Sequence, residues 1–255
     1  MTGAKKVRPV KMRLDQLVVD RGLAGSRERA RALILAGRVL VAEQKVDKPG
    51  VAVAVDAVVR MLGEEMRYVS RGGLKLEAAL EHWKIDVEGR ACLDIGTSTG
   101  GFTDCLLQHG AAQVTDVDTG FGQIAMKLRN DSRVRLMERT NARLLEAGGL
   151  AGEPALTLVV MDVSFISATL VLPAVVAAAP SLVEAVILVK PQFEAGREFV
   201  GKGGIVRDER GHAVAVERVA ECVGQLGWQV VETIPSPITG AEGNREFLLY
   251  ARKRS

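Results

Sequence analysis

The stretch Ala91–Thr103 reads Ala-Cys-Leu-Asp-Ile-Gly-Thr-Ser-Thr-Gly-Gly-Phe-Thr, and it decides the fold of this chain. Its apolar start ends in Asp94, a loop with three glycines follows, and a helical pattern begins at Phe102. The order strand, glycine loop, helix presents backbone N–H groups and a helix N-terminus to a ligand at the edge of an α/β sheet. We therefore expect a ligand-binding loop at this point of the chain.

The glycine spacing narrows the choice of ligand. Gly96-x-x-x-Gly100-Gly101 is not the G-x-G-x-x-G of a dinucleotide-binding turn, and the loop lacks the Gly-Lys-Ser/Thr ending of a P-loop. A strand-end aspartate followed by such a loop is typical of a site for S-adenosylmethionine. A loop that serves packing alone is the other interpretation.

The composition is typical of a soluble globular protein. The 255 residues, 47% hydrophobic and 25% charged, allow one large and one small domain. Three scattered cysteines and three isolated histidines suggest no metal site. The uncharged run 163–183 is long enough to cross a membrane, but Pro173 and Pro180 interrupt it, so we expect no membrane segment and a cytoplasmic protein.

Charge is distributed unevenly along the chain. Residues 1–60 hold 13 Lys/Arg against 6 Asp/Glu, whereas residues 61–255 hold 21 against 25. A basic N-terminal module on a nearly neutral body predicts docking on a polyanion such as RNA.

The basic module has its own pattern. A short amphipathic helix ends at Gly22, Ser26 is placed to cap a second helix over 27–36, and a Lys-Pro-Gly turn follows a short strand. This order resembles the S4 RNA-binding domain over residues 12–59, except that Ala42-Glu43 stands where that family usually has Asn-Gly. The resemblance implies RNA contacts, for which we select Arg13, Arg27, Arg31 and Lys48.

The flanking segments are predicted by composition. Residues 1–11 form a basic tail that we expect to be disordered, and residues 60–69 form a linker. From residue 70 the pattern alternates between strands and helices, which predicts a doubly wound α/β sheet over 70–255, mostly parallel with an antiparallel last strand. Strands are predicted over 111–118, 134–137, 155–161, 186–189 and 228–234, with a last one within 244–250, and helices over 121–129, 166–179 and 209–226.

Charged side chains follow several of these strands. Because parallel sheets bind ligands at the carboxyl ends of their strands, we expect Asp94, Asp118, Asp162 and Lys190 to meet at one edge. Asp118, some two dozen residues after the glycine loop, suits recognition of ribose hydroxyls. Lys190 ends an apolar strand and precedes a proline, so it can be a partly buried base or a lysine that simply reaches solvent.

Five ordered motifs carry a closer resemblance. Ser-Arg-Gly-Gly-x-Lys-Leu, Leu-Asp-Ile-Gly-x-Ser-x-Gly-Gly-Phe-Thr, Met-Asp-Val-Ser-Phe-Ile-Ser, Val-Lys-Pro-Gln-Phe-Glu and Gly-Asn-x-Glu-Phe-Leu are similar to those of the TlyA family. Its members, often labelled haemolysin A, join an S4 domain to an RrmJ/FtsJ-like, Rossmann-like methyltransferase domain.

The resemblance implies a reaction and its residues. The donor would be S-adenosylmethionine and the acceptor the 2′-hydroxyl of a cytidine in 16S or 23S rRNA, with ribosomal subunits as partners. The implied Lys-Asp-Lys-Glu tetrad falls on Lys75, Asp162, Lys190 and Glu246. The cofactor residues would be Asp94, Gly96, Thr97, Ser98, Thr99, Gly100, Gly101, Phe102, Asp118, Asn141 and Asp162.

Other functions stay open on the sequence. An RNA-binding protein with a vestigial methyltransferase fold, a haemolysin and a small-molecule methyltransferase are the alternatives. The complete tetrad argues against the first, the lack of a pore-forming segment against the second, and the basic module against the third. Oligomeric state is not indicated by any pattern.

Overall fold

The computed structural model describes residues 10–62, 67–240 and 243–254. The chain divides into two compact units, Met1–Glu65 and Met66–Ser255, here called the N-terminal and C-terminal units.

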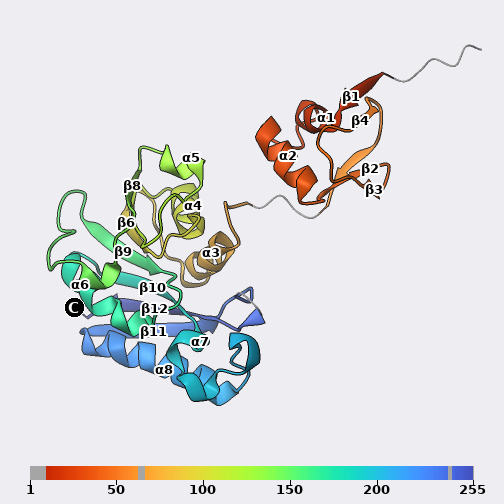
Figure 1. The fold of residues 1–255 in the computed structure, drawn as a ribbon. Helices are drawn as coiled ribbons and strands as arrows, with labels where there is room; N and C mark the ends of the chain where they lie inside the picture. Colours follow the sequence, from red (N-terminus) through yellow and green to blue (C-terminus); the bar gives the residue numbers. More distant parts are fainter. Residues whose placement is uncertain (1–9, 63–66, 241–242, 255) are drawn as a thin grey trace, which may run out of the picture. The chain divides into compact units, whose positions relative to one another are not determined.

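The N-terminal unit combines two helices with short strands (Figure 1). Ser26 caps the second helix, because its hydroxyl oxygen accepts a hydrogen bond from the N–H of Arg29. Apolar side chains from both helices and from the strands form one buried cluster around Leu14 and Ile34. The elements are β1 (Lys11–Arg13), α1 (Leu14–Asp20), α2 (Arg27–Leu35), β2 (Val39–Val41), β3 (Gln44–Lys45), β4 (Ala52–Ala54) and β5 (Val59–Met61).

The turn between β2 and β3 is formed by Ala42 and Glu43. Both have left-handed backbones, with φ of 50° and 62°, and Val41 pairs with Gln44 across the turn. Such a backbone suits Asn-Gly and is costly for most other residues. The hairpin therefore forms in spite of its unusual turn residues.

The predicted tail and the structure overlap at one end. Lys11 pairs with Ala54 between β1 and β4, so it belongs to the folded unit. The N–H of Val55 donates to the backbone oxygen of Val10, and residues 1–9 lie outside the described residues.

The predicted linker, 60–69, also overlaps with folded structure. Strand β5 continues to Met61, and Tyr68 is 3% exposed within the core of the C-terminal unit. Residues 63–66 lie outside the described residues.

Seven strands of the described C-terminal unit form one sheet, in the order β11-β12-β10-β9-β6-β7-β8. The pairs from β10 to β8 are parallel, whereas β12 runs antiparallel to both β10 and β11. The predicted doubly wound sheet with an antiparallel last strand is confirmed. The strands are β6 (Ala91–Ile95), β7 (Gln113–Val117), β8 (Val134–Met137), β9 (Leu156–Met161), β10 (Glu184–Val189), β11 (Trp228–Pro235) and β12 (Phe247–Lys253).

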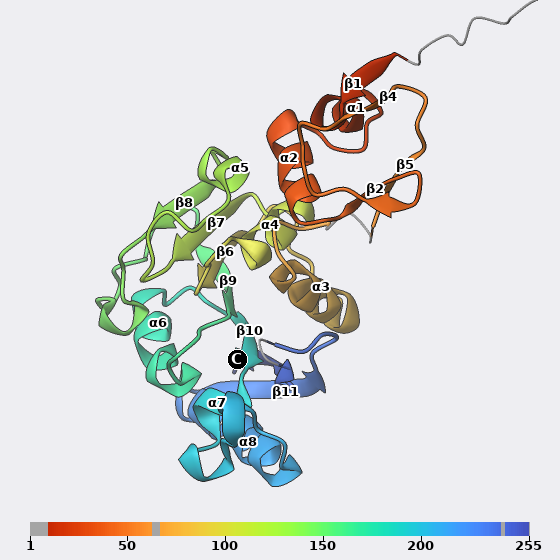
Figure 2. The same cartoon turned by 45° about the vertical axis from the view of Figure 1, so that its right-hand side comes forward.

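Helices cover both faces of this sheet (Figure 1, Figure 2). One apolar cluster includes α6 and α8, and the other includes α3 and α4. Neighbouring residues of β6 alternate between them, Cys92 in the second and Leu93 in the first, as the two-residue period of a strand requires. The helices are α3 (Gly72–Trp83), α4 (Gly101–Gln108), α5 (Met126–Arg129), α6 (Leu172–Ala178), α7 (Pro191–Glu194) and α8 (Glu209–Gln225), with 3₁₀ turns η1 (Ala142–Leu144), η2 (Ala168–Leu170), η3 (Arg197–Phe199) and η4 (Lys202–Gly204).

The prediction of a helix over 121–129 was wrong in its first half. Only Met126–Arg129 is helical. Gly122 has a φ of 71°, and its N–H donates to the carboxylate of Glu138 at 2.6 Å, which holds the preceding residues in a loop.

The prediction of one helix over 166–179 was wrong as well. The segment holds the 3₁₀ turn η2 and the separate helix α6, in whose first turn Pro173 stands. Proline lacks an N–H and is favoured in the first turn, so it starts a new helix here rather than continuing one.

Candidate active site

Two cavities open at the carboxyl edge of the parallel strands. The first, about 250 Å³, is lined by Lys75 and Lys190 and is called the lysine cavity. The second, about 510 Å³, is lined by Asp118 and is called the aspartate cavity. The cavities are adjacent because four residues line both: Gly96, Ser98, Asp162 and Ser164.

The glycine loop after β6 contributes Gly96 and Ser98 to the lining of both cavities. Gly96 has a φ of 86°, and a Cβ there would lie 2.5 Å from the backbone oxygen of Asp162. A Cβ on Gly101 would lie 2.3 Å from Ser70 Oγ and 3.0 Å from the backbone N of Gly73. The glycines therefore allow the loop to approach both the end of β9 and the start of α3, the helix that carries Lys75.

The four residues of the predicted tetrad meet at this edge as two ion pairs. Lys75 Nζ lies 2.5 Å from Glu246 Oε2, and Lys190 Nζ lies 2.6 Å from Asp162 Oδ1. The lysine side chains are each 10% exposed, and that of Glu246 is 2% exposed. Each buried charge is thus balanced by a partner, as burial of a charge requires.

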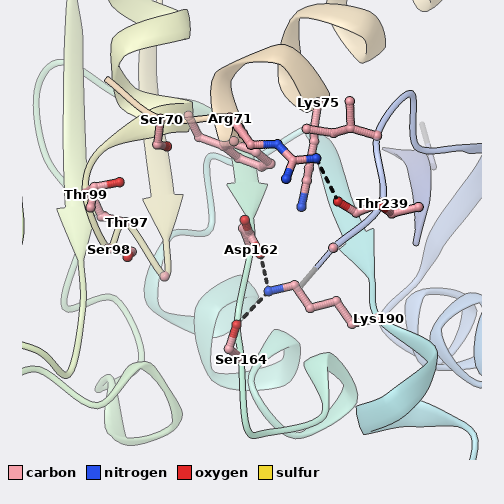
Figure 3. Close-up of a pocket in the computed structure, with 16 residues that line it drawn as sticks. Ser70, Arg71, Lys75, Thr97, Ser98, Thr99, Asp162, Ser164, Lys190 and Thr239 are labelled. Atoms are coloured by element: carbon pink, nitrogen blue, oxygen red, sulfur yellow. Dashed lines mark hydrogen bonds and ion pairs between the residues drawn. The ribbon is translucent and has the colours of Figure 1, made fainter. Parts of the chain in front are cut away.

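Lys190 has a second oxygen partner. Its Nζ donates a hydrogen bond to Ser164 Oγ at 2.6 Å, and Figure 3 shows Asp162 and Ser164 on two sides of this nitrogen. Pro191 begins α7 directly after Lys190 and limits the freedom of its backbone. Lys190 Nζ is thus held between a carboxylate oxygen and a hydroxyl oxygen.

Asp118 directly follows β7 and is held by backbone N–H groups. Its carboxylate accepts hydrogen bonds from the N–H of Ser98 at 2.7 Å and of Gly120 at 2.6 Å. Because a carboxylate has about four lone-pair positions, the same oxygens can still accept two sugar hydroxyls. Asn141 lines the aspartate cavity too and caps η1, accepting from the N–H of Arg143.

Asp94 is not among the residues that line the two cavities. Thr103 Oγ1 is 2.7 Å from Asp94 Oδ2 and 2.8 Å from Asp116 Oδ1, and both carboxyl groups are fully buried. Burial raises the pKa of both groups. One hydroxyl has one proton to donate, so the second contact is a hydrogen bond only if one of the carboxyl groups is protonated.

The donor set fits S-adenosylmethionine. The carboxylates of Asp118 and Asp162 line the aspartate cavity, where they can bind ribose hydroxyls and a positive charge. The backbone of Gly96 lines both cavities. No P-loop lysine stands in the loop, which a triphosphate would need. The residues that would hold this cofactor follow four neighbouring strands of the sheet, β9, β6, β7 and β8.

Most of the predicted cofactor residues line a cavity. Asp94 instead faces α4, and Gly100 forms the N-cap of α4 with a φ of 93°. The residues on cavity walls are Gly96, Thr97, Ser98, Thr99, Gly101, Phe102, Asp118, Asn141 and Asp162.

Sequence reasoning missed several residues of the lysine cavity, among them Ser164 and Arg71. Ser164 contacts Lys190, and Arg71 donates to the backbone oxygen of Thr239 at 3.3 Å (Figure 3). Both stand inside motifs that the sequence singles out. For Ser164 the available signal is its position two residues after Asp162, beyond the end of β9; for Arg71 there is only its place before two glycines.

The four predicted RNA contacts differ in their surroundings. Arg13 and Arg27 both bind Asp15, which is fully buried, at 2.8 Å and 3.3 Å. The hydrogen bonds from Arg13 lower the pKa of Asp15 to about 2. The guanidinium side chains remain about half exposed, 53% and 48%. Arg31 and Lys48 are exposed.

Comparison with known proteins agrees with both units. A model described as "FtsJ-like methyltransferase" matches residues 68–253, and a model described as "S4 domain" matches residues 12–59. Among the described residues, every helix is too short or too polar to cross a membrane.

Several relatives match nearly the whole chain. The 16S/23S rRNA (cytidine-2′-O)-methyltransferase TlyA of Mycobacterium tuberculosis is 47% identical, over 95% of this chain and 90% of its own. Hemolysin A of Brachyspira hyodysenteriae is 42% identical over 94% of this chain and 99% of its own. A solved structure of a protein from Streptococcus thermophilus, named as a hemolysin, is 44% identical and has a TM-score of 0.72. The match covers 97% of this chain and 90% of that chain. The chain therefore belongs to the TlyA family, in which an S4 domain is joined to an FtsJ-like methyltransferase domain.

Proposed function

We propose that this protein methylates the 2′-hydroxyl of a cytidine ribose in rRNA, 16S or 23S, with S-adenosylmethionine as donor. The observation that carries the proposal is the pairing of Lys190 with Asp162 and of Lys75 with Glu246. Lys75, Asp162 and Lys190 line one cavity. That cavity adjoins the one in which Asp118 can hold a ribose. The relative from Mycobacterium tuberculosis, whose name states this reaction, supports the choice of substrate.

The residues of the site have different roles in the proposed reaction. A ribose hydroxyl is a weak acid, so its proton must pass to a base as the oxygen attacks. When bound, the cofactor supplies an electrophilic methyl group on a sulfonium. Lys190, once neutral, accepts the hydroxyl proton, Asp162 orients this amine, and the Lys75–Glu246 pair aligns the acceptor ribose. General-base help of this kind contributes about 10²–10⁴ in rate.

The N-terminal unit supplies affinity for RNA. Its arginines and lysines can neutralise phosphates without reading bases, which suits a folded rRNA target. We infer that the acceptor is presented on a ribosomal subunit or its rRNA in the cytoplasm.

The test is methyl transfer from labelled S-adenosylmethionine to rRNA, followed by mapping of 2′-O-methyl positions. Lys190→Ala should lower the rate by at least about 100-fold, while the cofactor dissociation constant changes by less than about twofold. Lys253→Ala is the matched control, because Lys253 is an exposed lysine at the end of β12 remote from Glu246. It should keep the wild-type rate.

Two outcomes would contradict the proposal. If the wild-type protein binds rRNA but neither binds the cofactor nor transfers methyl groups, it is an RNA-binding protein with a vestigial fold. If Lys190→Ala transfers methyl groups within about tenfold of wild type, another group is the base.

A further inference from the structure

We propose that Ser164 is a positioning residue that relays the proton of Lys190 to solvent. The inference rests on the proposed function, since it concerns the proton that a ribose hydroxyl would give up. It starts from one contact: Lys190 Nζ donates to Ser164 Oγ at 2.6 Å.

Burial leaves Lys190 with few ways to lose a proton. The residue is 8% exposed. Asp162 lies 2.6 Å away and is the ion-pair partner of Lys190. A carboxylate is a much weaker base than an amine, so it is a poor final acceptor for this proton.

Ser164 has the opposite properties. Its residue is exposed, and it lines both the lysine cavity and the aspartate cavity. A hydroxyl can accept from Lys190 on a lone pair while its own proton is donated elsewhere. Ser164 therefore connects the buried Nζ of Lys190 with the two cavities, and Figure 3 shows the hydrogen bond between the two residues.

The backbone around Ser164 fixes this contact. The N–H of Asp162 donates to the backbone oxygen of Ile95 at 2.9 Å, which aligns the end of β9 with β6. On the far side, Glu194 of α7 accepts hydrogen bonds from Ser167 Oγ and from the N–H of Ala168. Because α7 begins right after Lys190, this contact ties the segment that carries Ser164 to the segment that carries the lysine.

The proposed relay conserves protons. After methyl transfer the hydroxyl proton of the ribose is on Lys190 as an ammonium N–H. One N–H bond of the ammonium then breaks as an O–H bond forms on Ser164 Oγ, and the original hydroxyl proton of Ser164 passes to water as hydronium. The lysine is left as a neutral amine and the serine as a hydroxyl, ready for the next acceptor.

The experiment compares Ser164→Ala and Ser164→Thr with wild type in methyl transfer to rRNA. Ser164→Ala should lower kcat about 10- to 100-fold, with KM for rRNA and the cofactor dissociation constant unchanged within about twofold. Ser164→Thr keeps a hydroxyl and should recover most of the rate. Ser181→Ala is the matched control, since Ser181 donates to Leu156 at the opposite end of β9 and should transfer methyl groups normally.

A second measurement separates a relay from a merely structural serine. Because removal of an exposed side chain opens Lys190 to small bases, added imidazole should raise the kcat of Ser164→Ala in proportion to its concentration. Wild type and Ser164→Thr should show no such rise.

Each remaining outcome contradicts the relay. A Ser164→Ala rate within twofold of wild type removes it, as does a raised KM for rRNA with unchanged kcat, which would make Ser164 a substrate contact. A slow variant that imidazole does not accelerate also removes it. If wild type itself transfers no methyl group, the proposed function fails, and the relay fails with it.

Discussion

Lys75 and Glu246 are 171 residues apart in the chain, and they form an ion pair of 2.5 Å at the edge of the C-terminal sheet. Lys190 is paired separately, with Asp162. The tetrad therefore consists of two ion pairs with different surroundings. Of the two lysines, Lys190 also donates a hydrogen bond to the exposed hydroxyl of Ser164, and Lys75 has no such bond among the described residues. This difference supports the proposal that Lys190 is the base and that Lys75 aligns the acceptor.

Replacement of Glu246 by Gln tests the first pair. The change leaves Lys75 with a neutral partner, and weakening a buried charged contact costs about 1–3 kcal/mol. We expect slower methyl transfer, by about 10- to 100-fold, with cofactor affinity nearly unchanged. Single-turnover kinetics and calorimetric titration measure the two quantities. Glu221→Gln, an exposed carboxylate of α8, is the control; equal rates for both variants would exclude a role for the pair.

The RNA contacts are best tested at Arg31. Arg31→Glu should weaken rRNA binding and reduce the slope of log affinity against log salt by about 1, since one phosphate contact is lost. Fluorescence anisotropy at several salt concentrations measures this. Arg27→Glu is a poor test, because it places a second carboxylate against buried Asp15 and should lower the stability of the N-terminal unit as well. An unchanged slope for Arg31→Glu would remove Arg31 from the RNA surface.

The turn at Ala42-Glu43 predicts that the N-terminal unit can be stabilised. The double variant Ala42→Asn, Glu43→Gly relieves two left-handed residues and should stabilise the hairpin by about 1 kcal/mol. The ion pair of Glu43 with Arg60 is lost, but both side chains are more than half exposed, so it contributes little. Amide hydrogen exchange of β2 and β3 measures the gain. Faster exchange in the variant would show that the native turn is not strained.

For the proposed catalytic residues, the sequence indicates the common edge of the sheet but not the pairing of the side chains. Strand-end positions and motif order bring Lys75, Asp162, Lys190 and Glu246 to one edge, because parallel strands share the direction of their carboxyl ends. Which carboxylate meets which lysine depends on side-chain directions across the whole sheet. No local pattern contains that information.

The same limit explains the arginines of the N-terminal unit. In a short amphipathic helix, Asp15 has the polar character of an exposed residue, so Arg13 and Arg27 look free to bind phosphate. The structure buries Asp15 completely between them. Burial of a carboxylate beside two flanking arginines is a tertiary property, and a sequence period of 3.6 does not reveal it.

Asp94 and Asp116 predict how the stability of the C-terminal unit depends on pH. Burial raises the pKa of both above the value of an unfolded aspartate, so the native state holds a proton that the unfolded state has lost near neutral pH. Stability is then fully present below the unfolded pKa, near 4, and falls as pH rises through the raised native values. Each such proton contributes a slope of about 1.4 kcal/mol per pH unit.

Asp116→Asn isolates this contribution. An amide cannot ionise, and it can donate to Thr103 as a protonated carboxyl group does. We expect wild type to lose more unfolding free energy than Asp116→Asn between about pH 5 and pH 9, whereas Glu221→Gln follows wild type. Tryptophan fluorescence during urea unfolding reports the C-terminal unit alone, because Trp83 and Trp228 are the two tryptophans of the chain and both belong to it. Parallel pH curves for wild type and Asp116→Asn would mean that neither carboxyl group keeps its proton, and that Thr103 donates to one of two charged partners.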